Sequence, residues 1–170
     1  VCIVGGGAIG LIMVQLAKLA GAAKIILSEP NGKRREAGLK LGADEAVDPT
    51  MEGAMESLLE TADVVIECVG NLPAVQSAFR FAKKGANIVL FSVPKVEARF
   101  ELPLFDVYKK ELTIKGSFVN PDTHSRAVAL LNAGKLDFSE IITHRFPLEQ
   151  MDEAIAMQMS DQSIKVVVFP

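Results

Sequence analysis

The sequence of 170 residues predicts a doubly wound α/β fold built on a six-stranded parallel sheet. Short apolar runs recur along the chain and are continuous rather than alternating, which is typical of strands covered on both faces. Helix-like stretches separate the runs, and this alternation favours right-handed crossovers between parallel strands. A glycine-rich turn after the first run is the third observation. The runs are Val1–Val4, Ile25–Leu27, Val64–Val69, Asn87–Phe91, Leu112–Ile114 and Val166–Phe169.

Five helices are predicted between and after these strands. Ala8–Ala20 is apolar nearly all round and stops at Gly21, as expected of a helix buried against a sheet. Asn31 can cap a second helix that runs to Leu41 and is closed by Gly42. The third starts at Pro73 and reaches about Ala82. The fourth starts at the cap Asn120, followed by Pro121, and ends near Gly134. The fifth spans Leu148–Met159.

Composition places the chain among ordinary soluble globular proteins of one domain. Hydrophobic residues make up 49% and charged residues 23%. The net charge of −3 argues against a surface for nucleic acid or anionic membranes. No apolar run approaches the roughly 18 residues of a membrane span, and no signal peptide opens the chain. Cys2 and Cys68 each lie in an apolar run, which favours buried thiols in a reducing cytoplasm over a disulfide.

The motif that carries chemistry is Gly5-Gly6-Gly7-Ala8-Ile9-Gly10, which fits G-x-G-x-x-G. Glycines at this spacing occur often by chance, so the setting matters. Here the motif follows a predicted strand and opens a helix, and Glu29 closes the next strand 19 residues beyond Gly10. Together these features predict the dinucleotide-binding turn of a Rossmann fold.

Each position of the turn has a physical task. Gly5 permits the tight turn, Gly7 lets a pyrophosphate approach the backbone, and Gly10 allows close packing between helix and strand. The amides around Ala8 and Ile9 lie at a helix N-terminus, where partial positive charge favours an anion. The turn is therefore predicted to bind the phosphates of a dinucleotide.

Glu29 bears on the choice of cofactor. Its carboxylate can accept hydrogen bonds from both hydroxyls of the adenosine ribose and would repel the 2′-phosphate of NADP, so NAD is predicted. The alternative is that Lys33, Arg34 and Arg35 hold that phosphate, although three basic residues here also suit the solvated first turns of a helix.

The whole chain resembles the medium-chain zinc-dependent dehydrogenases, specifically the group of sorbitol, threonine and butanediol dehydrogenases. The segments that carry the resemblance are VGGGAIG, SEPNGKRREAGLKLGAD, DVVIECVG, GANIVLFSV, ELTIKGSFVNPDTHSRA and ITHRFPLEQMDEAI. The later segments are the more specific, because many families share G-x-G-x-x-G.

The resemblance implies a cofactor site spread over the strand ends. Ile9 would lie against the pyrophosphate, Glu29 on the adenosine ribose, and Arg34 beside the adenine and ribose. Val69 and Gly70 would line the adenine-side crevice. The residues implied to border the nicotinamide are Ser92, Val93, Ser117, Phe118 and Val119.

The resemblance also implies a reaction and a missing part. The full enzyme would transfer hydride from a secondary alcohol or polyol to NAD, with a zinc ion polarising the alcohol oxygen. The family's zinc ligands come from an N-terminal GroES-like domain, which this sequence lacks. The chain also opens inside an apolar run, so we expect residues 1–170 to be the NAD-binding domain of a longer protein and to be inactive alone.

The chain's own reactive residues fit that expectation. Two cysteines 66 positions apart and two histidines form no metal-ligand spacing. His124 is interpreted as a surface or capping residue, and His144 as a structural contact between domains. Cys68 has no basic partner in sequence, which indicates an inert buried thiol.

Partners and rival functions complete the predictions. The alternating segment Ala98–Leu102 is predicted to be a sheet edge that pairs two copies into a homodimer or homotetramer. An NAD-sensing regulatory module without catalysis remains an alternative, as does a methyltransferase that binds S-adenosylmethionine. A short-chain dehydrogenase is excluded, because Tyr108 is the only tyrosine and is not followed by the lysine of Tyr-x-x-x-Lys.

Overall fold

The computed structural model describes residues 1–119 and 122–170 and contains the predicted six-stranded parallel sheet. All neighbouring strands of this sheet are parallel, and its order reverses between the first and fourth strands. Such a reversal opens a crevice at the carboxyl ends of the strands. In spatial order the strands are β3 (Glu45–Val47), β2 (Ile26–Ser28), β1 (Cys2–Val4), β4 (Ala62–Glu67), β5 (Ala82–Leu90) and β6 (Thr113–Gly116).

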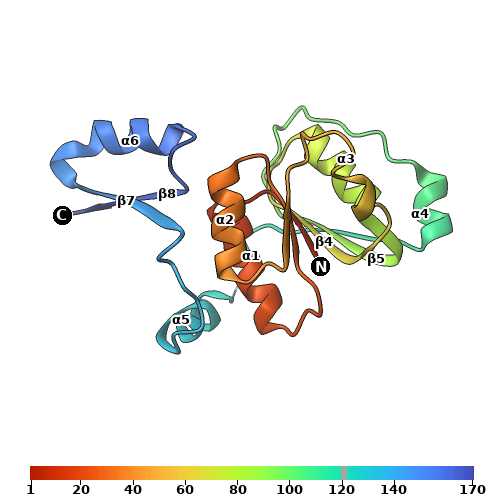
Figure 1. Ribbon diagram of the computed structural model, residues 1–170, viewed down its shortest axis with the longest axis horizontal. Helices are drawn as coiled ribbons and strands as arrows, with labels where there is room; N and C mark the ends of the chain where they lie inside the picture. Colours follow the sequence, from red (N-terminus) through yellow and green to blue (C-terminus); the bar gives the residue numbers. More distant parts are fainter. Residues whose placement is uncertain (120–121) are drawn as a thin grey trace.

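Helices cover both faces of the main sheet, as Figure 1 shows. On one face, α1 (Ala8–Leu19) and α2 (Gly32–Leu41) bury Leu11 and Leu41 against the odd-numbered strand residues Ile3 and Leu27. On the other face, α3 (Leu72–Phe81) buries Phe81. Side chains alternate along a strand, so Cys2, Val4 and Ile26 face α3. The fold prediction is therefore confirmed.

Asparagine side chains start two of these helices. Asn31 accepts a hydrogen bond from the Arg34 amide, as the sequence predicts, and Asn71 accepts one from the Ala74 amide. α2 ends at Gly42, which has a φ of +115°. Asparagine caps and a left-handed glycine satisfy the amides and carbonyls that a helix leaves unpaired at its ends.

A second, two-stranded parallel sheet lies beside the main one and is joined by α6 (Met151–Met159). Its strands are β7 (Ile142–Pro147) and β8 (Lys165–Phe169), with the 3₁₀ turn η2 (Leu148–Gln150) between β7 and α6. The predicted run Val166–Phe169 is thus a strand, but it pairs with β7. The sixth strand of the main sheet is β3, a segment of three half-buried residues that the apolar-run criterion missed.

The C-terminal unit is attached to the first half of the chain by specific contacts. Ile141 is buried in the same cluster as α1 and α2. Lys40 of α2 forms an ion pair of 3.1 Å with Glu140. The Asn31 side chain donates to the Asp161 carbonyl at 3.3 Å. These contacts bring the last 30 residues beside α2 at the sheet's edge (Figure 1).

The predicted sheet edge at Ala98–Leu102 is wrong, because the structure contains no strand there. β5 is paired with β4 on one side and with β6 on the other, so it offers this segment no unpaired edge. Phe100 instead packs on Phe79 of α3, with ring centroids 5.0 Å apart. The missed helix α4 (Leu104–Lys110) follows, and β6 forms this edge of the sheet.

The helix predicted from Asn120 starts later. The predicted cap and Pro121 lie outside the described residues, and α5 (His124–Asn132) follows the N-cap residue Thr123. Asp122 has a φ of +63°, which is incompatible with a right-handed helix at that position. The 3₁₀ turn η1 (Glu56–Leu58) precedes β4. In the described part of the chain, no helix is both long and apolar enough to cross a membrane.

Candidate functional site

The glycine-rich turn joins β1 to α1 with very little space to spare. Gly5 has a φ of +100°, and its amide donates to the Ser28 carbonyl at 2.8 Å. A Cβ on Gly10 would lie 1.7 Å from the Gly5 carbonyl oxygen. The third glycine of the motif is therefore required by the close contact between the first turn of α1 and the turn that precedes it.

The N-terminus of α1 is open to an anion. Gly7 is the N-cap residue, and none of the described side chains caps the helix. Beyond its own chain neighbours, no described atom lies within 4 Å of a Cβ placed on Gly7, so the approach to the first amides is clear. Ile9 is 46% exposed beside them. Amides without an intrahelical partner, together with the helix dipole, suit a phosphate group.

Glu29 is buried beside the turn and holds it from the second strand. One carboxylate oxygen accepts from the Gly6 amide at 2.6 Å, and the other accepts from the Asn31 amide at 2.9 Å. A Cβ on Gly6 would come within 2.8 Å of the Glu29 side chain, so this middle glycine is also required. A carboxylate has about four acceptor positions, which leaves capacity for the hydroxyls of a ligand.

Two of the three basic residues after Glu29 bond other parts of the protein, and the third, Lys33, is exposed. Arg35 donates to the carbonyls of Glu29 and Pro30, both at 2.7 Å, and pairs with Asp48 at 3.0 Å. Arg34 donates to the Ser163 carbonyl at 3.0 Å. Hydrogen bonds from Thr50, followed by the charge of Arg35, lower the pKa of Asp48. The Arg35 guanidinium is thus neutralised within the protein.

Glu67 is a buried acid beside the candidate site to which the sequence analysis assigned no role. It is fully buried at the end of β4, and one oxygen accepts from the amides of Val69 and Gly70, at 2.6 and 2.9 Å. Its other oxygen accepts a short hydrogen bond from the Ser92 hydroxyl. One carboxylate therefore ties the loop after β4 to the end of β5. A single acid inside the apolar run Val64–Val69 was the signal available.

Four of the residues expected at the cofactor thus lie together, namely Val69, Gly70, Ser92 and Val93. Gly70 has a φ of +86°, and a Cβ there would lie 3.1 Å from the Val93 carbonyl. Val93 itself is 87% exposed. Glycine is required at position 70 by both its conformation and the close approach of the next loop.

The segment after β6 supplies the remaining expected residues. The Ser117 amide donates to the Leu90 carbonyl at 3.2 Å, which places it level with the end of β5. Phe118 and Val119 are strongly exposed, and Val119 has a φ of +54°, unusual for a β-branched residue. Exposed apolar side chains at the strand ends fit a surface that contacts a ligand or another part of a protein.

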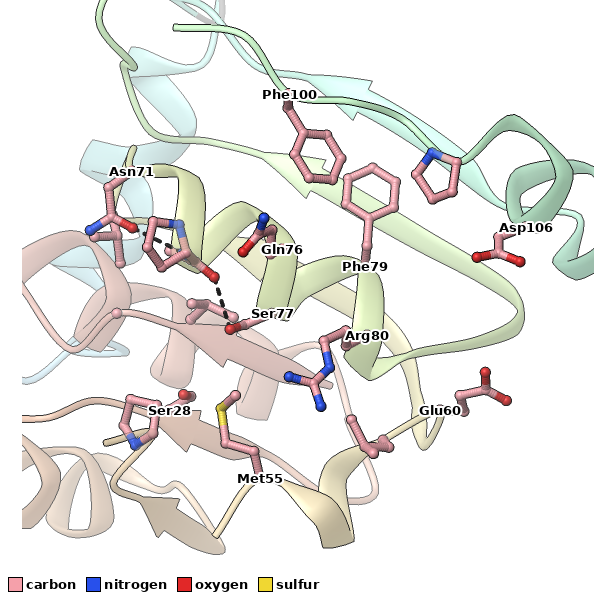
Figure 2. Close-up of a pocket in the computed structure, with 18 of the residues that line it drawn as sticks. Ser28, Met55, Glu60, Asn71, Gln76, Ser77, Phe79, Arg80, Phe100 and Asp106 are labelled. Atoms are coloured by element: carbon pink, nitrogen blue, oxygen red, sulfur yellow. Dashed lines mark hydrogen bonds between the residues drawn. The ribbon is translucent and has the colours of Figure 1, made fainter. Parts of the chain in front are cut away.

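A cavity of about 1130 Å³ begins at this crevice and runs below α3. Figure 2 shows Ser28 and Met55 on one side and the α3 residues Gln76 and Ser77 on the other. The lining near the strand ends is largely apolar and includes Val4, Gly5, Ser28, Pro30, Val69, Pro73 and Ala74.

Cys2 is buried and Cys68 is half-buried, and the predicted contact of His144 between domains stays a prediction. Burial, and then the charge of Glu67, raises the pKa of the Cys68 thiol to about 12, which indicates an unreactive group. His124 is exposed as the first residue of α5. His144 is exposed on β7 and lies parallel to the Phe146 ring. In residues 1–119 and 122–170 no three histidine, cysteine or acidic side chains gather to hold a metal.

Known proteins share this sequence and fold. Residues 8–133 match the family model described as zinc-binding dehydrogenase. An L-threonine 3-dehydrogenase of Symbiobacterium thermophilum is 33% identical over all of this chain and 50% of its own length. A sorbitol dehydrogenase of Bombyx mori is 30% identical over 99% of this chain and 50% of its own length.

A solved structure of a related protein has the same fold. A zinc-binding dehydrogenase of Sinorhizobium meliloti 1021, bound to NADP, superposes with a TM-score of 0.94 and 35% identity, over 99% of this chain and 52% of its own. The chain spans about half the length of the curated relatives that it matches. The family model and the shared fold lead to one conclusion: this chain belongs to the zinc-binding dehydrogenase family.

Proposed function

We propose that this chain is the cofactor-binding part of a zinc-dependent dehydrogenase that oxidises a secondary alcohol or polyol with NAD. The observation that carries the proposal is the open helix N-terminus at Gly7 with the buried carboxylate of Glu29 beside it. The relatives named for threonine and sorbitol act on compounds that carry hydroxyl groups on secondary carbons, which supports the substrate class.

The residues fit a dinucleotide laid across the strand ends. The pyrophosphate would lie on the amides of Ala8 and Ile9, and the adenosine ribose on Glu29. Arg34 would border the adenine side while its guanidinium stays on the Ser163 carbonyl. The adenine would lie at Val69 and Gly70. The residues proposed to border the nicotinamide are Ser92, Val93, Ser117, Phe118 and Val119.

The chain's part in the reaction is to bind and orient. Bound NAD supplies the hydride acceptor, and the tie from Glu67 to the loops after β4 and β5 holds the walls against which the cofactor would lie. The described residues do not fit a catalytic zinc site, because no set of three suitable side chains converges. The zinc ligands would come from a part of the protein outside residues 1–170.

We propose NAD rather than NADP because the local charges oppose a 2′-phosphate. Glu29 places a carboxylate where that phosphate would lie, and the Arg35 guanidinium is already paired with Asp48. The Sinorhizobium meliloti relative bound NADP, so this preference requires a direct test.

Calorimetric titration of this chain with NAD, NADP and S-adenosylmethionine tests the proposal. We expect NAD to bind most tightly and Glu29→Ala to weaken it about 10- to 100-fold, the loss of hydrogen bonds to a charged acceptor. Glu29→Gln keeps an acceptor for the Gly6 amide and should narrow the preference for NAD over NADP. Glu36→Ala, an exposed acid of α2, is the control. Tighter binding of NADP by the unmodified chain would contradict the cofactor assignment.

We further propose that two copies pair along β6. This strand is the edge of the main sheet, and α4 beside it exposes Leu104, Phe105 and Tyr108 by 70 to 80%. Unpaired strand edges and exposed apolar side chains both favour association. We expect light scattering to give the mass of a dimer or tetramer, and Ile114→Pro to shift it toward the monomer by removing an amide donor that points away from β5. A strictly monomeric mass would exclude the proposal.

A further inference from the structure

Ser28 carries a buried hydroxyl without a partner. It is the last residue of β2 and is 2% exposed, and its Oγ has no hydrogen-bond partner among the described residues. Gln15 bonds Asp137, and Ser163 bonds the Met157 carbonyl. Arg34 Nε also lacks a partner, but that guanidinium donates to the Ser163 carbonyl through Nη2. Because an unmade buried hydrogen bond costs stability, a buried hydroxyl that makes no hydrogen bond with the described residues points to a ligand.

The position of Ser28 directs that hydroxyl toward the cavity. Ser28 pairs with Val4 in the sheet, and both residues face α3 and line the cavity beside Val69. Glu29, one residue later, faces the opposite way and bonds the Gly6 amide. Rotation about the single Cα–Cβ bond of Ser28 carries its Oγ between staggered positions, so the hydroxyl can turn to the cavity wall.

Three polar side chains around the cavity form hydrogen bonds within the protein. Asn71 caps α3 through the Ala74 amide, and the Ser77 hydroxyl donates to the Pro73 carbonyl, as the dashed lines of Figure 2 show. The Thr50 hydroxyl donates to Asp48 at 2.6 Å. Asn71 and Gln76 keep free amide groups but are exposed, so Ser28 is the buried side chain with unused hydrogen-bonding capacity in this part of the described cavity.

We propose that Ser28 is a specificity-determining residue whose hydroxyl donates a hydrogen bond to a ring nitrogen of the adenine base. This inference rests on the proposed function, which puts the adenosine ribose on Glu29. The base is one bond from that ribose, and the apolar walls at Val4, Pro30 and Val69 suit a flat heteroaromatic ring. Ring nitrogens of a purine accept hydrogen bonds, and the serine hydroxyl can donate one.

The test pairs a protein variant with altered ligands. The variant is Ser28→Ala, and the ligands are NAD and three analogues in which adenine N1, N3 or N7 is replaced by CH. We expect Ser28→Ala to weaken NAD binding about fivefold to tenfold, the loss of one hydrogen bond. The unmodified chain should bind one analogue more weakly by the same factor, and Ser28→Ala should bind that analogue and NAD equally. Ser77→Ala, whose hydroxyl is satisfied within α3, is the matched control.

The melting temperature of Ser28→Ala without ligand is a second measurement, and it distinguishes a structural hydroxyl from an unsatisfied one. A structural hydroxyl would lower the melting temperature when it is removed, whereas removing an unsatisfied one should leave it unchanged or raise it. Two results would overturn the inference while the proposed function stands. One is that Ser28→Ala binds NAD as tightly as the unmodified chain does. The other is that the unmodified chain binds all three analogues as tightly as NAD. No binding of NAD by the unmodified chain would instead contradict the proposed function.

Discussion

Replacing Gly10 by alanine is expected to abolish NAD binding and to lower the free energy of unfolding by about 3 kcal/mol, the upper range for overpacking a tight site. The added Cβ would lie 1.7 Å from the Gly5 carbonyl oxygen, which is backbone and cannot turn away as a flexible side chain could. The turn and the first turn of α1 must separate, and the amides proposed to bind the pyrophosphate move with them. Urea denaturation and calorimetric titration measure the two effects.

Gly7→Ala is the matched control for that experiment. A Cβ at Gly7 meets no described atom within 4 Å, and its backbone, with φ of −69°, accepts alanine. We expect a change in the free energy of unfolding of about 1 kcal/mol or less, the range for an N-cap change from glycine to alanine. NAD binding should still weaken by about tenfold or more, because a methyl group then covers the path to the amides. Equal loss of stability in both variants would contradict this account of the two glycines.

Glu67→Ala is expected to have the second large effect. The substitution removes the acceptor for the amides of Val69 and Gly70 and for the Ser92 hydroxyl, and leaves space in a fully buried position. We expect the free energy of unfolding to fall by about 3 to 5 kcal/mol, since each unsatisfied buried donor costs about 1 to 3 kcal/mol. Urea denaturation monitored by circular dichroism measures the change.

Glu67→Gln separates the hydrogen bonds from the charge. Its amide oxygen can still accept from Val69 and Gly70, while its NH₂ group can donate to the Ser92 oxygen. Compared with Glu67→Ala, we expect Glu67→Gln to recover most of the free energy of unfolding and to bind NAD with an affinity closer to that of the unmodified chain. Asp63→Ala removes an exposed acid from the same strand and should change stability little. If Glu67→Ala unfolded no more easily than Asp63→Ala, the proposed tie between the two loops would be wrong.

Much of the fold could be predicted because its signals are local. Continuous apolar runs of three to six residues indicated strands covered on both faces, and five of the six runs are strands of the main sheet. Asn31 and Gly42 marked the ends of α2 through short-range capping. The motif from Gly5 to Gly10, with Glu29 after the second run, indicated the binding turn because its spacing is set by one strand, one turn and one helix.

Other features were decided by contacts between distant residues. β3 is three residues long and half-buried, so only its pairing with β2 makes it a strand. Val166–Phe169 has the pattern of a core strand, but its partner is β7, and no local pattern specifies which strand a ladder joins. The segment Ala98–Leu102 alternates like an edge strand, yet β6 already occupies that side of β5.

Local patterns along the chain were enough to predict the fold class, the glycine-rich turn and the acid at Glu29, because helix periods, caps and turns depend on neighbours in the chain. Only the tertiary structure decided that Glu67 joins two loops, that Gly6 must be a glycine and that Ser28 is buried without a partner. The physical reason is that burial and hydrogen-bond satisfaction are properties of the groups that surround an atom. Glu67 reaches Ser92, 25 residues away, Gly6 meets Glu29, 23 residues away, and the burial of Ser28 leaves its hydroxyl without a partner among the described residues.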